Sequence, residues 1–161
     1  MRKVIIGVMG PGRGATEFDI EAAFGLGVAI AESGYILLTG GRKEGVMDAA
    51  AKGAKSKGGL TIGILPGTNT DGMSDAVDIP VFTGMHNARN NINVLSSKVV
   101  IACGLGAGTL SEIMLAVKSG IPIILLCTNE LTKKFLNELS GPSIIHVNTV
   151  EAAIKELEEL L

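Results

Sequence analysis

Three short glycine-rich segments are the parts of this chain best suited to hold an anion. They read GPGRGATE at 10–17, TGGRKEG at 39–45 and GLGAGTLSE at 104–112. Glycine lets the backbone approach a ligand closely, and a helix that follows such a loop offers N–H groups to an anion. One such loop could be an ordinary turn, but three at one sheet edge support one another. The sequence therefore predicts a site for a phosphate or nucleotide, with candidate residues Gly10, Gly12, Gly40, Gly41, Gly104, Gly106, Ala107, Gly108 and Thr109.

Two side chains of the third loop have two possible explanations. Thr109 and Glu112 have the spacing of a capping box, in which Thr109 caps the following helix and Glu112 returns to the Thr109 amide. A helix that starts in this way can still present both side chains to a ligand. Arg89 indicates a ligand more directly, because a cation at the start of a helix is disfavoured unless it meets an anion. Arg89 and Glu112 are therefore the candidate catalytic residues if the protein is an enzyme.

The spacing disfavours other familiar sites. A P-loop requires Lys and then Ser or Thr after its last glycine, and none of the loops has them. A dinucleotide fingerprint requires an acidic residue where this chain has Thr39, Gly40 and Gly41, so NAD is disfavoured. The sequence shows no convincing Ser/His/Asp or Cys/His pattern. We expect His146 to be structural, and a role for His86 stays open.

Seven apolar segments are expected to be the strands that position these loops. Each is almost continuously hydrophobic, which is typical of parallel strands covered on both faces. They span 3–9, 35–39, 60–65, 78–82, 98–103, 122–127 and 143–147. Helical patterns lie between them, the first with an apolar face that contains Ile20, Phe24, Val28 and Ala31.

This alternation predicts a single-domain, doubly wound α/β fold of the Rossmann-like type over residues 1–161. We expect a parallel sheet of about seven strands with helices on both faces. Ligands of such sheets bind beyond the carboxyl ends of the strands. The three glycine-rich loops are expected at that edge.

The composition disfavours several classes of partner. The chain has 161 residues and a net charge of −2, with no Trp and one Tyr, so we expect no nucleic-acid partner. No apolar stretch reaches the roughly 18 residues of a membrane span, so no membrane partner is expected. Cys103 and Cys127 lack metal-ligand spacing and are expected to be small core residues. We therefore expect no metal site, no disulfide framework and a cytoplasmic location.

Four segments, taken in order, resemble the LOG (Lonely Guy) superfamily of Rossmann-like proteins, which were long misannotated as lysine decarboxylases. They are TGGRKEGVMDAA, GGLTIGILPG, NARNNINV and GAGTLSEI, and the resemblance extends to about residue 127. These motifs are most similar to those of the branch of molybdenum-cofactor carrier proteins. This resemblance implies a homo-oligomer, either a dimer or a tetramer.

LOG enzymes are phosphoribohydrolases, which split a nucleoside 5′-monophosphate into a free base and ribose 5-phosphate. Their glycine-rich motif matches residues 104–112, which implies that Gly106, Gly108 and Thr109 hold phosphate and that Glu112 acts at the ribose. Their essential arginine matches Arg89. Their paired glycines match Gly40 and Gly41.

The chain also departs from the hydrolase pattern. Gly104 stands in place of a proline, Leu105 and Arg42 in place of glycines, and Asn90 in place of a lysine. The resemblance therefore favours a carrier-like protein that binds a phosphorylated small molecule, either a nucleotide or the molybdenum cofactor, which is a phosphorylated pterin. No cofactor is expected to be required. A LOG-like phosphoribohydrolase and a scaffold without a ligand remain the alternatives.

Overall fold

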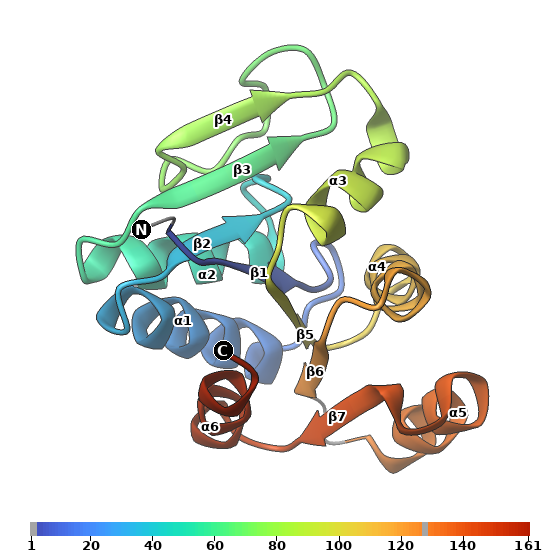
Figure 1. Ribbon diagram of the computed structural model, residues 1–161. Helices are drawn as coiled ribbons and strands as arrows, with labels where there is room; N and C mark the ends of the chain where they lie inside the picture. The colour runs from blue at the N-terminus through green and yellow to red at the C-terminus, as the bar shows by residue number, and fades with distance from the viewer. Residues whose placement is uncertain (1–2, 127–128) are drawn as a thin grey trace.

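The computed structural model describes residues 3–126 and 129–161. Within these ranges, seven parallel strands form one sheet and six α-helices cover it (Figure 1). The strands are β1 (Ile5–Met9), β2 (Ile36–Thr39), β3 (Thr61–Leu65), β4 (Ile79–Phe82), β5 (Val99–Cys103), β6 (Ile123–Leu126) and β7 (Ile144–Val147). The helices are α1 (Glu17–Glu32), α2 (Gly45–Ser56), α3 (Asn90–Leu95), α4 (Ala107–Ser119), α5 (Glu130–Ser140) and α6 (Val150–Leu160), with short 3₁₀ turns η1 (His86–Arg89) and η2 (Gly141–Ser143).

The prediction of a doubly wound α/β fold is confirmed. Each described strand lies inside one of the seven segments expected from the sequence. The last residue of the sixth segment, Cys127, lies outside the described residues.

The strand order creates the place where a ligand can bind. The order is β4-β3-β2-β1-β5-β6-β7, so the chain moves outward from β1 to β4 and then returns to place β5 on the other side of β1. In a parallel sheet, connections that leave neighbouring strands in opposite directions open a crevice at the carboxyl ends of those strands. The first and third glycine-rich loops follow β1 and β5, and the second follows β2, beside β1.

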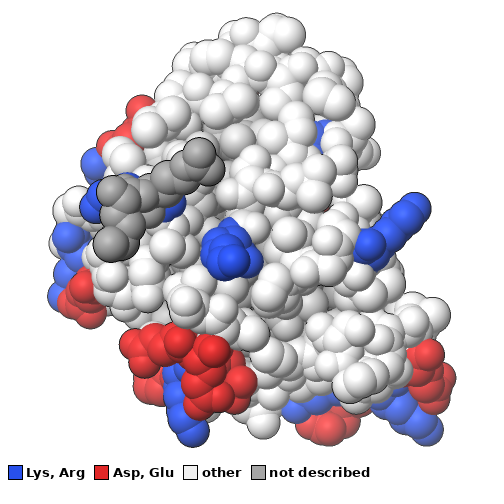
Figure 2. All heavy atoms as spheres, viewed as in Figure 1, with Lys and Arg blue, Asp and Glu red and all other residues white. Residues whose placement is uncertain are grey.

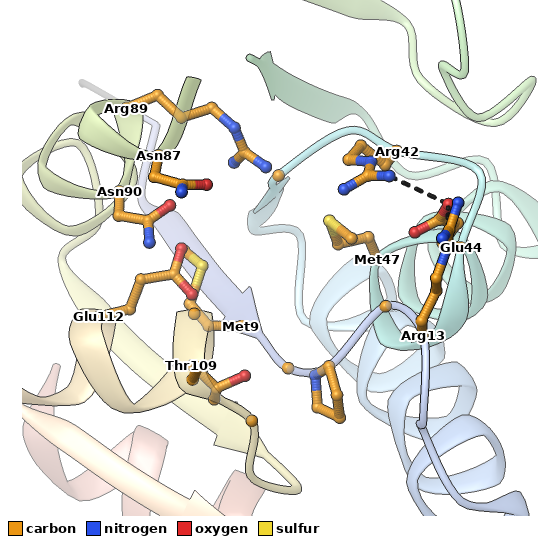
Figure 3. Close-up of a pocket in the computed structure, with 17 residues that line it drawn as sticks. Met9, Arg13, Arg42, Glu44, Met47, Asn87, Arg89, Asn90, Thr109 and Glu112 are labelled. Atoms are coloured by element: carbon orange, nitrogen blue, oxygen red, sulfur yellow. Dashed lines mark hydrogen bonds and ion pairs between the residues drawn. The ribbon is translucent and has the colours of Figure 1, made fainter. Parts of the chain in front are cut away.

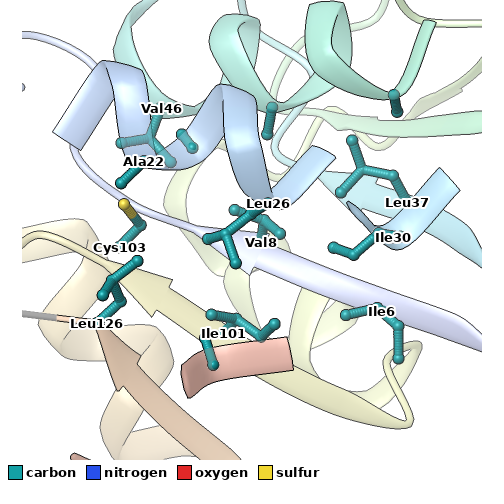
Figure 4. Packing of buried hydrophobic residues seen from close by; sticks show 14 of the residues in the cluster. Ile6, Val8, Ala22, Leu26, Ile30, Leu37, Val46, Ile101, Cys103 and Leu126 are labelled. Carbon is teal, nitrogen blue, oxygen red and sulfur yellow. The ribbon is translucent and has the colours of Figure 1, made fainter. Parts of the chain in front are cut away.

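Two apolar layers hold the helices against the sheet. Helices α1, α2 and α6 cover one face, and α3, α4 and α5 cover the other (Figure 1). Successive strand residues alternate between the layers: Ile6 and Val8 pack with the first group of helices, whereas Met9 packs with the second. Figure 4 shows the first layer, in which Leu26 and Ile30 of α1 lie over β1 and β2.

The expected apolar face of α1 is not the one that the structure buries. Ile20 and Phe24 are each 43% exposed, whereas the buried side of the helix is made of smaller residues together with Leu26 and Ile30. The reason is close packing against α2: a Cβ atom on Gly27 would collide with the carbonyl oxygen of Ala50. Small residues allow this approach but carry little hydrophobicity, so the sequence pattern favoured the wrong side.

The surface carries both charges and apolar side chains. On the face shown in Figure 2, charged residues of both signs gather along the lower and left edges, whereas most of the upper surface, over β3, β4 and α3, is uncharged. The edge strand β4 exposes Ile79, Val81 and Phe82. Among the described residues, no helix combines the length and the apolar character needed to cross a bilayer.

Candidate functional site

A cavity of about 460 Å³ lies at the carboxyl ends of β1, β2 and β5 (Figure 3). Its volume is within the range of roughly 300–1,000 Å³ that is usual for small-molecule sites. All three glycine-rich loops contribute to its walls, as does the turn η1. Most of the residues predicted from the sequence line it, namely Gly10, Gly12, Gly40, Arg89, Gly106, Ala107, Gly108, Thr109 and Glu112.

Two of the predicted glycines, Gly41 and Gly104, are not among the lining residues. Both have positive φ angles, +74° in each case, which favour glycine. A Cβ atom on Gly104 would also lie 2.6 Å from the Oδ1 atom of Asp19, and one on Gly41 would lie 2.9 Å from the Cα atom of Gly63. The turn geometry and the packing explain these two glycines without a ligand.

The glycines at the start of α4 have no such explanation. Nothing lies within 4 Å of a Cβ atom built on Gly108, and the nearest atom to one on Gly106 is the Cβ of Pro11, at 3.4 Å. Neither residue has a positive φ angle. Larger side chains would fit the fold at these two positions but would fill the cavity.

Helix α4 begins earlier than the sequence pattern predicts, so the predicted capping box is wrong. Its N-cap is Gly106, which makes no side-chain cap, and the helix begins at Ala107 rather than after Thr109. The extended backbone of Gly106 (φ −151°, ψ 172°) starts the helix three residues before the predicted position. Thr109 and Glu112 therefore lie inside the helix, and the N–H groups of residues 107–109 have no acceptor within it.

Thr109 points into the cavity with an unsatisfied hydroxyl group (Figure 3). The side chain is almost completely buried, and its Oγ1 atom has no hydrogen-bond partner among the described residues. A buried hydroxyl group without a partner is destabilising. Thr109 therefore has a hydrogen-bonding capacity that the protein itself does not use.

Arg89 is brought to the same cavity by the turn η1 and lies at the N-terminus of α3. It is only 8% exposed, its Nε atom has no hydrogen-bond partner, and it forms no ion pair with any described residue. Burial lowers the pKa of Arg89, and the charge of Glu112 opposes this shift. A Cβ atom on Gly40 would lie 2.6 Å from its Nη1 atom, so the bare backbone there makes room for the guanidinium group. A buried cation of this kind is suited to pair with an anion.

Glu112 faces the cavity from α4 and is held by Asn93 of α3. The Nδ2 atom of Asn93 donates a hydrogen bond of 2.7 Å to the Oε1 atom of Glu112. Burial raises the pKa of Glu112 to about 7, although the Asn93 hydrogen bond and the charge of Arg89 lower it. Near neutral pH, the carboxyl group can therefore exist in either protonation state. Asn93 was not predicted from the sequence, although it lies about one helical turn after Arg89 and that spacing could have indicated it.

The opposite wall of the cavity carries three charged residues that the sequence analysis did not select. The Nη2 atom of Arg42 lies 3.0 Å from the Oε1 atom of Glu44, and the Nε atom of Arg13 lies 3.7 Å from the same oxygen. Figure 3 shows these three side chains facing the wall that holds Thr109 and Glu112. The signal was present in the sequence, because charged residues stand directly among the loop glycines.

The remaining sequence candidates lie away from the cavity walls. His86 is exposed with a φ of +48° and is not a lining residue. His146 lies in β7, where its Nε2 atom is 2.8 Å from the Oδ1 atom of Asn137. Cys103 is buried in the core, as expected, and Cys127 lies outside the described residues. Within the described part of the chain, no group of three His, Cys, Asp or Glu residues is arranged to hold a metal ion.

Comparison with known proteins gives the evolutionary context of this cavity. The structure of the molybdenum cofactor binding protein from the phototrophic bacterium Rippkaea orientalis matches with a TM-score of 0.97 and 54% identity, over 99% of this chain and 98% of that one. The Moco carrier protein from Chlamydomonas reinhardtii matches with a TM-score of 0.92 and 49% identity, over 99% of this chain and 98% of that one. An uncharacterised protein of Archaeoglobus fulgidus is 48% identical over 120 residues, which are 74% of this chain and 78% of the relative.

The family assignment confirms the resemblance seen in the sequence motifs. The model of the SLOG cluster4 family matches residues 3–154, which is nearly the whole chain. The structural matches agree with the similarity to the molybdenum-cofactor carrier branch. The chain therefore belongs to the SLOG cluster4 family, a LOG-like group, and lies near its molybdenum-cofactor carriers.

Proposed function

We propose that this protein binds a phosphorylated small molecule of the molybdenum-cofactor type in the cavity at β1, β2 and β5 and acts as its carrier. The observation that carries the proposal is the pair of buried, unsatisfied side chains in one cavity, Arg89 and Thr109. Both line the cavity: Thr109 enters it from α4, and the Arg89 guanidinium enters it from η1, beside Gly40 (Figure 3). A phosphate group there would satisfy the hydroxyl group, the guanidinium group and the free N–H groups of the helix together.

The phosphate is expected to lie against Gly106, Gly108 and Thr109. The two glycines leave the backbone N–H groups accessible, because no side chain covers them. Arg89 enters the same cavity from η1 and would supply the positive charge. This division of roles explains why glycine is present where the fold would accept a larger residue.

The rest of the cavity suits a polar heterocycle such as a pterin. Met9 and Met47 line the cavity between its two charged walls (Figure 3). Thioether groups make favourable contacts with flat aromatic rings, so they can replace the aromatic residues that are scarce in this chain. The Rippkaea orientalis and Chlamydomonas reinhardtii proteins, which bind or carry the molybdenum cofactor, support this ligand class.

The ligand that leaves the protein on denaturation tests the proposal. Mass spectrometry of material released from purified wild-type protein should detect a phosphorylated pterin. Protein with Arg89→Gln should release almost none and Thr109→Val clearly less than wild type, whereas Lys118→Gln, in the last turn of α4, should release as much as wild type. Equal release from all four proteins would contradict the proposed site.

A second candidate function is hydrolysis of a nucleoside 5′-monophosphate, as in LOG enzymes. The observation that favours it is Glu112, a buried carboxyl group with a pKa of about 7 in the same cavity as Arg89. Such a group can stabilise positive charge on a ribose and orient water. Incubation with a panel of nucleoside monophosphates should then yield ribose 5-phosphate. Glu112→Gln should abolish this yield, and unchanged turnover would contradict a catalytic role.

We also propose that the protein forms a homo-oligomer, either a dimer or a tetramer. The edge strand β4 exposes Ile79, Val81 and Phe82, each by 38% or more. An exposed apolar edge strand is a site at which another chain can pair. Light scattering coupled to size-exclusion chromatography should find a multiple of 16.6 kDa. Val81→Lys should shift the protein towards the monomer.

A further inference from the structure

On the wall of the cavity opposite α4, two arginine side chains form ion pairs with the same carboxylate. Arg13 comes from the loop after β1, and Arg42 comes from the loop after β2. Both point to the Oε1 atom of Glu44, at 3.7 Å and 3.0 Å (Figure 3). All three residues line the same cavity as Arg89 and Thr109.

Glu44 is used in an unusual way for its position. It is the N-cap of α2, yet its side chain makes no capping hydrogen bond to that helix. The carboxylate is instead turned to the two arginines. Its position in the cavity is where an anionic group of a ligand would meet the same two guanidinium groups.

The contacts that hold Glu44 are of a kind that a ligand can replace. The side chain of Arg13 is 90% exposed and that of Arg42 is 40% exposed. Ion pairs that are open to water contribute little, typically less than about 1 kcal/mol. An oxyanion, which can accept parallel hydrogen bonds from guanidinium groups, would compete with the carboxylate at small cost.

We propose that Arg13 and Arg42 form a second anion subsite and that Glu44 occupies it until a ligand arrives. The inference rests on the proposed function, since it assigns the other end of the ligand whose phosphate lies at α4. The ligand class is therefore a molecule with an oxyanion group at each end and a polar, uncharged part between them. The cavity has three arginines and only two carboxyl groups among its lining residues, which favours an anionic ligand.

Tungstate is a suitable probe, because it is a tetrahedral oxyanion whose heavy atom can be located by anomalous diffraction. Crystals of the full chain soaked in tungstate should show two positions, one at residues 106–109 and one between Arg13 and Arg42. Arg13→Gln should lower the occupancy of the outer position only, and Thr109→Val that of the inner position only. Arg13 is exposed enough that its substitution should leave the fold intact.

Glu44→Gln distinguishes a ligand substitute from a purely structural residue. It keeps the side-chain length and removes the competing charge, so titration calorimetry should show outer-site tungstate affinity rising by about threefold to tenfold. Lys43→Gln is the matched control, because Lys43 pairs with the exposed Asp75 rather than with a cavity residue. Lys43→Gln should change the tungstate affinity of neither the inner nor the outer position.

The outcomes separate this inference from the proposed function. Tungstate at the inner position alone, in both wild type and Glu44→Gln, would overturn the second subsite and leave the proposed function standing. Tungstate at neither position would overturn both. Weaker outer binding in Glu44→Gln would show that Glu44 supports the anion rather than competes with it, and would overturn its role as a substitute.

Discussion

Helices α1 and α4 both have a threonine and an acidic residue three positions apart near their N-termini, but only α1 uses the pair as a capping box. Each helix follows a glycine-rich loop. The loop before α1 follows β1, the loop before α4 follows β5, and these two strands are neighbours in the sheet. Thr16 and Asp19 have the same spacing as Thr109 and Glu112. In α1, the Thr16 side chain accepts from the Asp19 amide at 3.1 Å and Asp19 accepts from the Thr16 amide at 2.9 Å, which is a complete capping box.

In α4 the same spacing gives no cap, because the helix already begins at Ala107. Thr109 keeps an unsatisfied hydroxyl group, and Glu112 pairs with Asn93 instead of with the backbone. Helix α1 therefore satisfies two N–H groups of its first turn with its own side chains, whereas α4 has no such cap. The comparison teaches that a threonine and an acid three residues apart stabilise a helix only where the threonine is its N-cap.

Arg89→Gln is expected to have the largest effect on ligand binding at α4. It removes the buried charge that distinguishes the α4 site, so affinity for a phosphorylated ligand should fall by about a hundredfold to a thousandfold. Isothermal titration calorimetry measures this directly. The free protein should be no less stable, because Arg89 forms no ion pair with a described residue that would be lost.

The control for Arg89 is Lys118→Gln, which removes one charge from the exposed end of α4. Its affinity should match that of wild type. A similar decrease in both variants would mean that only the net charge matters, and the α4 site would then be no different from the rest of the surface.

The next test uses the pH dependence of Glu112. Its pKa is raised from 4.5 to about 7 by burial, so the folded state favours the neutral carboxyl group. Below pH 4.5 both states bind the proton. As pH rises towards 7, the unfolded state ionises first and the folded protein loses up to about 3 kcal/mol, with no further loss above that range.

Glu112→Gln cannot ionise and should lack this loss. Urea unfolding at a series of pH values should show the wild type becoming progressively less stable than the variant between pH 4.5 and 7. A constant difference between wild type and Glu112→Gln would contradict the raised pKa.

The strands could be predicted from the sequence, whereas the start of α4 could not. Continuous apolar runs such as the one ending at Cys103 have one physical explanation, which is a strand covered on both faces. The spacing of Thr109 and Glu112 has two explanations, and the backbone angles of Gly106 decide between them. The local sequence does not specify those angles, since glycine can adopt many backbone conformations.

Part of the candidate site was also predictable. The glycine loops were selected because parallel strands bring their following loops to one edge, and Arg89 was selected because a cation at the start of a helix is disfavoured unless it meets an anion. The role of Asn93 depends on Glu112, which is 19 residues away in the sequence, and the roles of Arg42 and Glu44 depend on the direction of their side chains. Arg42 and Glu44 lie in a loop that was interpreted only through its glycines.

Gly108→Ala should separate folding from binding at α4. A Cβ atom there meets nothing within 4 Å, and alanine is a better helix residue, so stability should rise by about 0.5–1 kcal/mol. The same methyl group enters the space proposed for phosphate, so ligand affinity should fall by about tenfold. Thermal unfolding and calorimetry on the same sample measure both effects.

The matched control is Gly25→Ala in α1, where the nearest atom to the added Cβ is the Cγ2 of Val150, at 3.4 Å. This variant should also gain stability but bind the ligand as wild type does. If Gly108→Ala binds normally too, the phosphate does not lie against this turn.

The smallest effects come from replacing the two threonines by valine, which removes only the hydroxyl group. Thr16→Val breaks the capping box and should lower the free energy of unfolding by about 1 kcal/mol without changing ligand affinity. Thr109→Val removes a hydroxyl group that has no partner among the described residues, so stability should stay the same or rise slightly. Ligand affinity should nevertheless fall, by about tenfold.

The two variants should therefore change different properties, although the substitution and the local sequence pattern are the same. Thr16→Val should lower the free energy of unfolding, and Thr109→Val should lower ligand affinity. Urea unfolding and calorimetry give the free energy of unfolding and the ligand affinity of each variant. A loss of stability in one variant and a loss of affinity in the other is expected only if α1 uses its threonine for folding and α4 uses its threonine for a ligand. Loss of stability in Thr109→Val would mean that this hydroxyl group has an internal role after all. The buried hydroxyl group would then no longer support an anion at α4, and Arg89 alone would carry the proposal.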